Sequence, residues 1–321
     1  MQYNHLGRSG LELSELSFGS WLTFGSKLDF GKARECVHAA IDAGINFFDS
    51  AEVYSNGVAE SILGKILKEF NRNEVVVSTK IFWGGDKPNQ TGLSRKHLIE
   101  GTKASLKRLK MEYVDLLYCH RPDPNTPIEE TVLAMDYLVR SGSAFYWGTS
   151  EWSADQIQSA FEFAKEYKLV PPTMEQPEYN MFAREKIEGE YLPLYEKYGL
   201  GTTTWSPLAS GILTGKYIDG IPDGSRLGRV RWLKAEYDKY EMFTKERANK
   251  IKDLLSLAKE LGITLPQLAI AWCLKNINVS SVILGASSIE QLQENIKAAE
   301  VKELLDPAVM SKIDSILGNS R

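Results

Sequence analysis

Short runs of apolar residues alternate with longer amphipathic segments along almost the whole chain. The short runs are apolar on both faces, which is typical of strands buried in a parallel sheet. The longer segments repeat their apolar positions with the period of helices that cover a core on one side. The strands predicted in this way end near Gly19, Asp49, Lys80, His120, Thr149, Gln176, Trp205 and Leu284.

The helices predicted between these strands have recognisable ends. Ser94 and Ser153 are suitable N-caps, and Gly44, Gly199 and Gly262 are suitable stops at the other end. The amphipathic pattern itself places helices at 32–43, 94–109, 127–140, 154–167 and 248–261.

Eight strand–helix repeats in one chain predict an α/β protein, a (β/α)8 (TIM) barrel rather than an open doubly wound sheet. We expect a single domain over residues 1–321. A hairpin over 2–6 and 10–13, turning at 7–9, would plug the bottom of the barrel. Two long segments, 81–93 and the glycine-rich 206–243, follow strands and are expected to be loops on the catalytic face.

Composition excludes several classes of protein. A net charge of −4 without a long basic run argues against binding to nucleic acid. The first residues have no signal-peptide pattern, and no apolar stretch has membrane-spanning length, so no membrane insertion is expected. Cys36, Cys119 and Cys273 are isolated, which predicts a reducing, cytoplasmic setting with no disulfide and no metal site. We expect Cys119 to pack in the core.

Four polar residues follow the ends of three neighbouring strands: Asp49, Tyr54, Lys80 and His120. Because the carboxyl ends of parallel strands share one face, these side chains are expected to meet. A phenol titrates at about 10 and needs help to act as an acid at neutral pH. Lys80 would stabilise its anion, Asp49 would hold Lys80, and His120 would orient a substrate oxygen.

Each residue alone has a plainer explanation, as a helix cap, a rim aromatic, a solvated strand end or a structural histidine. Together they favour a proton-donating site with Tyr54 as the donor.

Residues 285–291, from Gly285 through Ser287 to Gln291, form a small-residue turn after the last strand, before a helix. Such a turn can bind an anion, although an ordinary serine cap explains it equally well. Lys216 and Arg226 in the preceding loop would add positive charge. No Gly-x-Gly-x-x-Gly follows a strand, and the P-loop-like run 211–217 lacks the required spacing and the serine or threonine.

The run 46–54 (NFFDSAEVY), with Lys80 and His120 after it, resembles the catalytic tetrad of the aldo-keto reductase superfamily. The resemblance covers essentially the whole chain and is closest to the potassium-channel β-subunit branch with its plant and bacterial relatives. It rests further on the runs 78–85 (STKIFWGG), 148–153 (GTSEWS), 205–211 (WSPLASG) and 265–273 (LPQLAIAWC).

The resemblance implies NADPH bound across the barrel mouth. Ser150 and Gln176 would hold the nicotinamide amide beside Trp205. The remaining positions carried over for the cofactor are Ser206, Leu208 and Ser210 at the pyrophosphate, Lys216 and Arg226 closing over it, Ser287 and Gln291 at the 2′-phosphate, Glu294 and Asn295 near adenine, and Ser20, Trp21 and Gly285.

The function implied is NADPH-dependent reduction of small aldehydes or ketones. Trp21, Trp83 and Trp152 would form an aromatic substrate wall, unless some of them only pack loops.

Animal channel β subunits carry Asn at the position of His120 and often extend upstream of the barrel, which favours an enzyme here and makes a channel partner doubtful. A redox-sensing channel subunit with slow turnover remains the alternative, with a barrel isomerase or aldolase acting on phosphorylated sugars as a third possibility. The resemblance also implies a homo-oligomer, a tetramer or larger.

Overall fold

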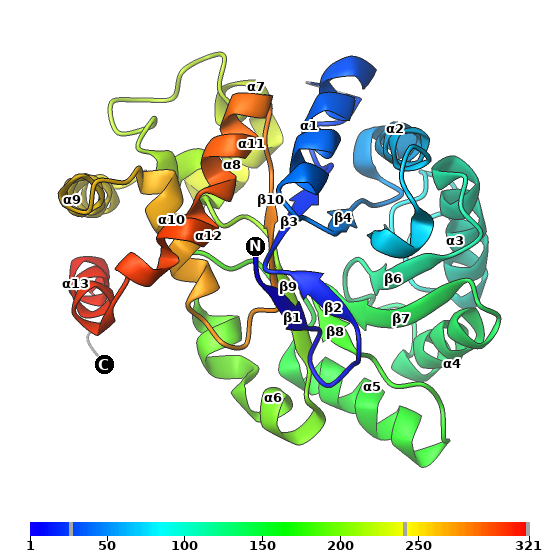
Figure 1. The fold of residues 1–321 in the computed structure, drawn as a ribbon. Coiled ribbons are helices and arrows are strands. Elements are labelled where there is room, and N and C mark those ends of the chain that lie inside the picture. Colours follow the sequence, from blue (N-terminus) through cyan, green and yellow to red (C-terminus); the bar gives the residue numbers. More distant parts are fainter. Residues whose placement is uncertain (26–27, 240–242, 319–321) are drawn as a thin grey trace.

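The computed structural model describes residues 1–25, 28–239 and 243–318, and its centre is a closed barrel of eight parallel strands (Figure 1). The eighth barrel strand pairs with the first and with the seventh, which closes the ring. The predicted (β/α)8 barrel is therefore confirmed, and each strand ends within one residue of its predicted end. The barrel strands are β3 (Leu16–Gly19), β4 (Phe47–Asp49), β5 (Val76–Ile81), β6 (Val114–Cys119), β7 (Ala144–Thr149), β8 (Met174–Glu175), β9 (Gly201–Thr204) and β10 (Ser281–Leu284).

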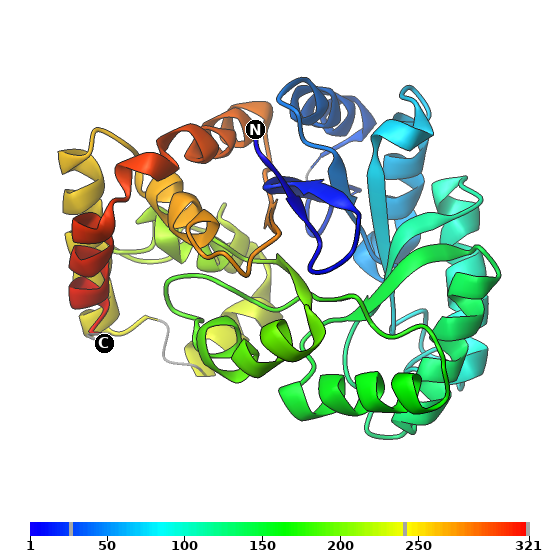
Figure 2. The same cartoon turned by 60° about the horizontal axis from the view of Figure 1, so that its bottom comes forward.

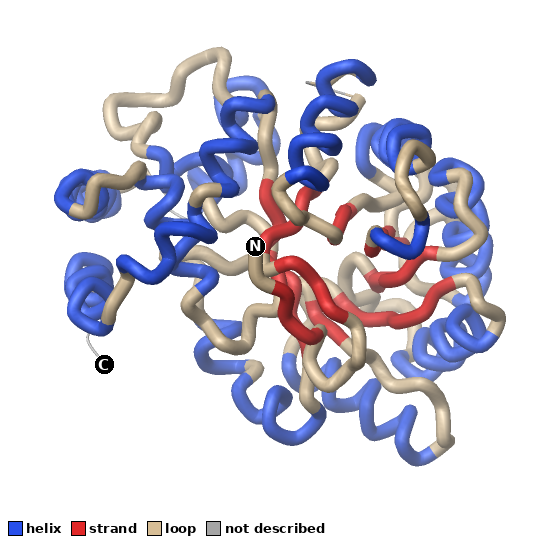
Figure 3. Tube along the Cα trace, in the orientation of Figure 1, coloured by secondary structure: helices blue, strands red, loops and turns tan. Residues whose placement is uncertain are grey.

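Helices surround the strands on the outside, as Figure 3 shows in blue around red. Those that follow the barrel strands are α1 (Phe30–Asp42), α2 (Val58–Leu67), α3 (Arg95–Leu109), α4 (Ile128–Arg140), α5 (Ala154–Glu166), α6 (Leu192–Tyr198), α10 (Leu265–Leu274) and α11 (Ile289–Ile296). Further helices are α7 (Arg226–Arg229), α8 (Arg231–Lys239), α9 (Lys245–Glu260), α12 (Ala298–Val301) and α13 (Pro307–Leu317). Shorter helical turns lie at Tyr54–Gly57, Arg72–Glu74, Lys186–Glu190, Ala209–Thr214 and Lys302–Leu304. Helices α9 and α13, distant in sequence, lie side by side in both Figures 1 and 2.

The predicted caps are present. Ser94 accepts a hydrogen bond from the His97 backbone N–H at the start of α3, and Ser153 forms a reciprocal capping box with Gln156 at the start of α5. Gly199 ends α6 with a φ of 65°, a left-handed conformation that glycine adopts without strain. Gly44 and Gly262 have the same left-handed conformation directly after the ends of α1 and α9.

The predicted hairpin closes one end of the barrel. Strands β1 (Tyr3–His5) and β2 (Glu12–Ser14) pair antiparallel and lie in front of the barrel in Figure 1 and across its middle in Figure 2. Leu6 and Leu13 from this hairpin are fully buried against interior side chains that include Phe47 and Met174. The barrel floor is therefore sealed by apolar contacts, and the open end is the one where the strands finish.

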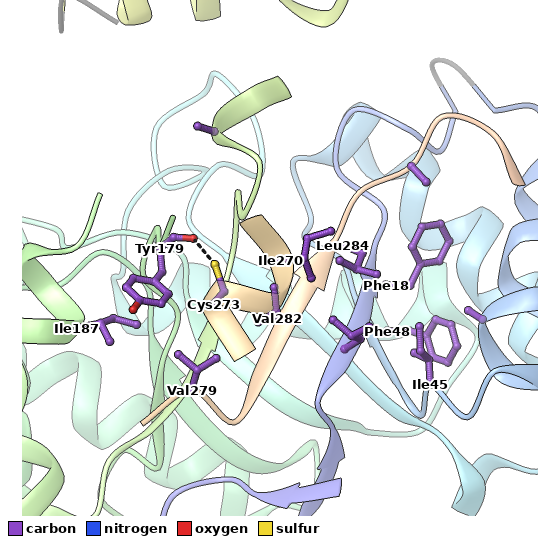
Figure 4. Packing of buried hydrophobic residues seen from close by; sticks show 14 of the residues in the cluster. Phe18, Ile45, Phe48, Tyr179, Ile187, Ile270, Cys273, Val279, Val282 and Leu284 are labelled. Atoms are coloured by element: carbon purple, nitrogen blue, oxygen red, sulfur yellow. Dashed lines mark hydrogen bonds between the residues drawn. The ribbon is translucent and has the colours of Figure 1, made fainter. Parts of the chain in front are cut away.

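Outward-facing strand residues pack against the helices. Figure 4 shows Phe18, Phe48, Val282 and Leu284 of three strands in this layer, with Ile270 of α10 beside them. All three cysteines are buried and free, and Cys119 lies in the same apolar layer, as predicted. No helix in the described part of the chain is by itself long and apolar enough to cross a membrane. Helices α9 and α10 reach that length and composition only as a pair, and the chain bends by 89° between them.

The two long segments after strands differ in structure. Residues 82–92 form an irregular loop in which Trp83 bridges to Thr91. The segment 206–243 was predicted as a glycine-rich loop, but its described residues contain the turn Ala209–Thr214 and helices α7 and α8. Buried Leu227 and Leu233 anchor these helices to the core, and Ser225 caps α7, so apolar contacts outweigh the low helix propensity of glycine.

Candidate active site

The four residues predicted to meet do lie together at the open end of the barrel. Lys80 Nζ lies 2.5 Å from Asp49 Oδ2 and donates to Tyr54 Oη at 3.1 Å. It also donates to the Ser50 carbonyl oxygen at 2.8 Å, so the buried ammonium has three partners. The rings of Tyr54 and His120 meet edge to face with their centroids 5.8 Å apart.

Local backbone geometry positions the phenol of Tyr54. The chain leaves β4 and forms a short helical turn at Tyr54–Gly57 in which Ser55 and Asn56 have φ values of 50° and 52°. Left-handed conformations are uncommon for residues other than glycine, so other contacts must hold this turn in place. One such contact is the hydrogen bond from Ser55 Oγ to the Phe24 carbonyl oxygen, at 2.8 Å.

The electrostatics of Tyr54 and Lys80 are coupled. Burial raises the pKa of Tyr54, while the charge and the hydrogen bond of Lys80 oppose that rise without cancelling it. Burial alone would lower the pKa of Lys80, but the charge of Asp49 and the neighbouring phenol outweigh it, so the pKa of Lys80 is raised. Lys80 is therefore charged and Tyr54 protonated at neutral pH, which is the state that an acid catalyst needs.

His120 is a neutral imidazole in this environment. Burial, followed by the nearby charges of Lys80 and Arg121, lowers its pKa well below the ordinary value for histidine. Its Nδ1 atom is buried and has no hydrogen-bond partner among the described residues. Trp83 also packs edge to face with the imidazole ring, with centroids 5.0 Å apart. A neutral histidine beside the phenol can donate a hydrogen bond to a carbonyl oxygen.

Asp49 also connects Lys80 to the predicted nicotinamide residues. Its Oδ1 atom accepts hydrogen bonds from Ser78 Oγ at 2.7 Å and from Gln176 Nε2 at 3.1 Å. Ser150 Oγ in turn donates to the Gln176 carbonyl oxygen at 2.9 Å. The side chains of Ser150 and Gln176 are thus already oriented by neighbours at the strand ends.

A cavity of about 1140 Å³ opens above these strand ends. Its size exceeds that of most small-ligand pockets, so it can hold a ligand as long as a dinucleotide together with a small substrate. Most of the predicted site residues line it: Trp21, Asp49, Tyr54, Trp83, His120, Ser150, Gln176, Trp205, Ser206, Leu208, Ser210, Lys216, Arg226, Gly285, Ser287, Gln291, Glu294 and Asn295. Lys80 lies behind Tyr54 and does not line the cavity.

Two predicted residues lie elsewhere. Ser20 is buried, and its hydroxyl lies within hydrogen-bond distance of the Asp49 carbonyl oxygen, at 3.1 Å, and of Ser50 Oγ, at 3.0 Å. Trp152, predicted as part of the substrate wall, is buried in the apolar core, and Tyr191 Oη donates to its carbonyl oxygen. The prediction for Trp152 as a substrate-facing residue is therefore wrong, and the packing alternative holds for it. Trp21 and Trp83 do face the cavity.

Glu151 explains how Trp205 is held at the cavity. Trp205 Nε1 donates to Glu151 Oε1 at 3.0 Å, and the backbone N–H of Glu178 donates to the same oxygen at 2.6 Å. Lys186 Nζ pairs with the other carboxylate oxygen of Glu151 at 2.8 Å. The indole of Trp205 then meets Trp21 edge to face, with centroids 6.3 Å apart.

The far end of the cavity is built around the start of α11. Gln291 Oε1 accepts hydrogen bonds from both the backbone N–H and the hydroxyl of Ser287, each at 2.9 Å. Glu294 Oε1 accepts from Gln267 Nε2 at 3.0 Å. The guanidinium of Arg226, from α7, lies 5.6 Å from the centre of the Trp21 ring, and both residues line the cavity.

Several cavity residues were missed from sequence. A signal was available for two of them, because Arg121 directly follows His120 and Glu178 lies two positions after Gln176. The others come from segments without a motif. The missed residues include Arg121, Glu178, Asn180, Phe182, Trp232, Tyr237 and Arg247.

Comparison with known proteins agrees with this geometry. The Aldo/keto reductase family model matches residues 15–318 of the chain. A probable voltage-gated potassium channel subunit beta from Arabidopsis thaliana is 56% identical over 320 residues, which span 99% of this chain and 97% of that protein. A protein of the same description from Oryza sativa subsp. japonica is 54% identical over 320 residues, with the same two coverages of 99% and 97%. The chain therefore belongs to the aldo/keto reductase family, and that membership supports an oxidoreductase activity.

Proposed function

We propose that the protein reduces aldehydes or ketones to alcohols with NADPH, with Tyr54 as the proton donor. The observation that carries the proposal is the contact between the Lys80 ammonium and the Tyr54 phenol, 3.1 Å apart at the wall of the large cavity. An ammonium at this position stabilises the phenolate that remains after the proton has left.

The residues of the cavity fit NADPH. Arg226 is partly buried, burial lowers its pKa, and it forms no ion pair with any described residue. A guanidinium held in this way is suited to a phosphate. Lys216 also lines the cavity, and it too lacks an ion pair within the described ranges. Ser150 and Gln176 would orient the nicotinamide amide, and Ser287 with Arg226 would select the 2′-phosphate.

NADPH, when bound, supplies the hydride that forms the new C–H bond at the carbonyl carbon. The electron pair of the C=O π bond moves to the oxygen, which takes the proton from Tyr54 Oη. Lys80, held by Asp49, stabilises the developing phenolate, and neutral His120 donates a hydrogen bond to the same carbonyl oxygen. Trp21 and Trp83 provide apolar surface for the substrate, and selection of the phosphorylated cofactor favours the reductive direction.

Replacing Tyr54 by Phe tests the mechanism directly. Tyr54→Phe should abolish NADPH oxidation with 4-nitrobenzaldehyde or methylglyoxal while leaving NADPH affinity, followed by quenching of tryptophan fluorescence, nearly intact. Tyr137→Phe, which removes a hydroxyl from an exposed residue of α4, serves as the matched control. Retained turnover in Tyr54→Phe would exclude the phenol as proton donor.

A second candidate is a redox-sensing regulatory subunit that binds NADPH tightly and turns it over slowly. The description of the Arabidopsis and rice relatives as probable potassium channel β subunits favours this candidate. Tight NADPH binding without multiple turnovers, together with copurification of a channel protein, would support it. A homo-oligomer of four or more subunits is part of the same proposal and is measurable by light scattering. Family membership gives no support to the isomerase or aldolase alternative.

A further inference from the structure

Arg121 occupies the cavity wall directly after His120. Its Nη1 atom donates to the His120 carbonyl oxygen at 2.6 Å and to Ser150 Oγ at 3.2 Å. The guanidinium also lies 5.6 Å from the centre of the Trp83 ring. These contacts fix the guanidinium between the proton-donating group and one edge of the aromatic substrate surface.

Two sides of this guanidinium remain available to a ligand. An arginine has five N–H donors, and the contacts above engage only those of Nη1. Nε and Nη2 of Arg121 have no hydrogen-bond partner among residues 1–25, 28–239 and 243–318, and no carboxylate of these ranges pairs with the side chain. By contrast, Arg72, Arg108 and Arg184 are similarly half-buried and each pairs with an acidic side chain.

Several acidic residues line the same cavity. Glu178 is one whose charge interacts with Arg121, but it is poorly suited to neutralise this guanidinium. Glu178 accepts a hydrogen bond from Asn180 Nδ2 at 3.1 Å and forms no ion pair within the described residues. Burial, together with the charge of Glu151, raises the pKa of Glu178 to about 7. Close to neutral pH this carboxyl is therefore partly protonated and does not fully compensate the positive charge of Arg121.

We propose that Arg121 binds a carboxylate carried by the substrate, so that the preferred substrates are short aldehydes or ketones with an anionic carboxylate remote from the carbonyl. This inference rests on the proposed reductase function. The planar fork of Nε and Nη2 matches a carboxylate in a bidentate arrangement. A single guanidinium with Glu178 nearby suits a monoanion better than a doubly charged phosphate.

Because Arg121 directly follows His120, binding of the carboxylate by Arg121 also orients the substrate. With the carboxylate on Arg121 and the carbonyl oxygen between Tyr54 and His120, the substrate is fixed at two points, and Trp83 covers the atoms between them. The carboxylate keeps its charge and its bonds throughout the reaction, because only the carbonyl carbon and oxygen gain the hydride and the proton.

The test compares substrates that differ only in charge. 4-Formylbenzoate is compared with its methyl ester for the unmodified protein, Arg121→Met and Arg121→Lys. In Arg121→Met we expect kcat/KM for 4-formylbenzoate to fall about 10- to 100-fold more than kcat/KM for the ester, the range of a lost hydrogen bond to a charged group. The ester reports the smaller loss that follows from the contacts of Arg121 with His120 and Ser150. Arg121→Lys retains the positive charge but not the planar fork of donors, so its kcat/KM for 4-formylbenzoate should lie between the values for the unmodified protein and for Arg121→Met. Arg229→Met removes an exposed guanidinium from α7 and controls for overall charge.

A second measurement, inhibition by a carboxylate, keeps the inference testable if Arg121→Met folds poorly. Benzoate should inhibit reduction of 4-nitrobenzaldehyde by the unmodified protein competitively, and Arg121→Met should abolish this inhibition. Preference of the unmodified protein for the ester, or equal loss of both substrates in Arg121→Met, would overturn the inference while leaving the reductase proposal intact. Absence of turnover with every aldehyde would overturn both.

Discussion

Lys80 Nζ and Asp49 Oδ2 lie 2.5 Å apart in a site where the lysine side chain is fully buried and the aspartate side chain is 4% exposed. Water therefore screens neither charge. Removing one partner of a buried pair leaves the other charge uncompensated, which costs about 3–5 kcal/mol.

Asp49→Asn should accordingly lower the free energy of unfolding by about 3 kcal/mol, as measured by urea unfolding, and should strongly reduce kcat. The double variant Asp49→Asn/Lys80→Met should regain part of the stability, because neither charge is then left alone, but none of the activity. A double variant no more stable than Asp49→Asn alone would contradict this interpretation of the pair.

Glu52 holds the loop that carries Trp83. Its buried Oε1 accepts from the Phe82 backbone N–H at 2.7 Å and lies 3.1 Å from His97 Nε2. Glu52→Ala leaves the Phe82 N–H without this acceptor, so we expect a loss of about 1–3 kcal/mol of stability and a rise in KM for aromatic aldehydes larger than the change in kcat.

Two further variants separate loop positioning from general damage. Glu52→Gln keeps an acceptor for the Phe82 N–H and should reverse most of the rise in KM. Glu100→Ala removes an exposed glutamate of α3 and should change little. If Glu52→Gln behaves like Glu52→Ala, the hydrogen bond to the loop is not what matters.

Selection of NADPH over NADH should depend on the part of the cavity near the start of α11. Arg226 forms no ion pair with any residue that the structure describes, and the Ser287 hydroxyl donates to Gln291 Oε1 at 2.9 Å. Arg226→Ala and Ser287→Ala should each weaken NADPH binding more than NADH binding, because only NADPH carries the 2′-phosphate. Fluorescence titration with both cofactors measures the difference, and equal losses would remove the 2′-phosphate assignment.

Glu175 should make stability depend on pH. Its side chain is fully buried, and burial raises its pKa to about 8, from an ordinary value of 4.5. The native state therefore keeps the proton over a range in which the unfolded chain has lost it. The resulting stability is complete below about pH 4.5 and is lost as the pH rises through about 8.

Glu175→Gln is neutral at every pH and should flatten this dependence, so its melting temperature relative to the unmodified protein should be higher at about pH 9 than at about pH 5. Glu129→Gln, at an exposed position of α4, is the control. Parallel curves of melting temperature against pH for the unmodified protein and Glu175→Gln would show that Glu175 does not titrate in this range.

Much of this architecture could be predicted because its determinants are local. Apolar runs define strands and their ends, and the strand ends place Asp49, Lys80 and His120 on one face. The prediction for Trp152 failed because the chain turns after β7. Glu151 has a φ of 63°, which breaks the alternation of side-chain directions, so Trp152 points into the core although Ser150 faces the cavity.

Other features depend on contacts between distant segments. Helices α7 and α8 form in a glycine-rich stretch because Leu227 and Leu233 find apolar partners elsewhere in the fold, and no local pattern reports those partners. The position of Arg121 directly after His120 was a local signal, but the absence of a carboxylate partner among the described residues is a property of the assembled cavity.

The hairpin that closes the bottom of the barrel also limits the route by which ligands enter and leave the cavity. With Leu6 and Leu13 filling that end, the cofactor and the carbonyl compound of the proposed reaction would share the opening at the other end. An arriving aldehyde then stands in the path of a departing cofactor, so abundant aldehyde should slow cofactor exchange. The rate of turnover would then depend on how fast the cofactor and the substrate exchange through a single opening, because Leu6 and Leu13 close the other end of the barrel.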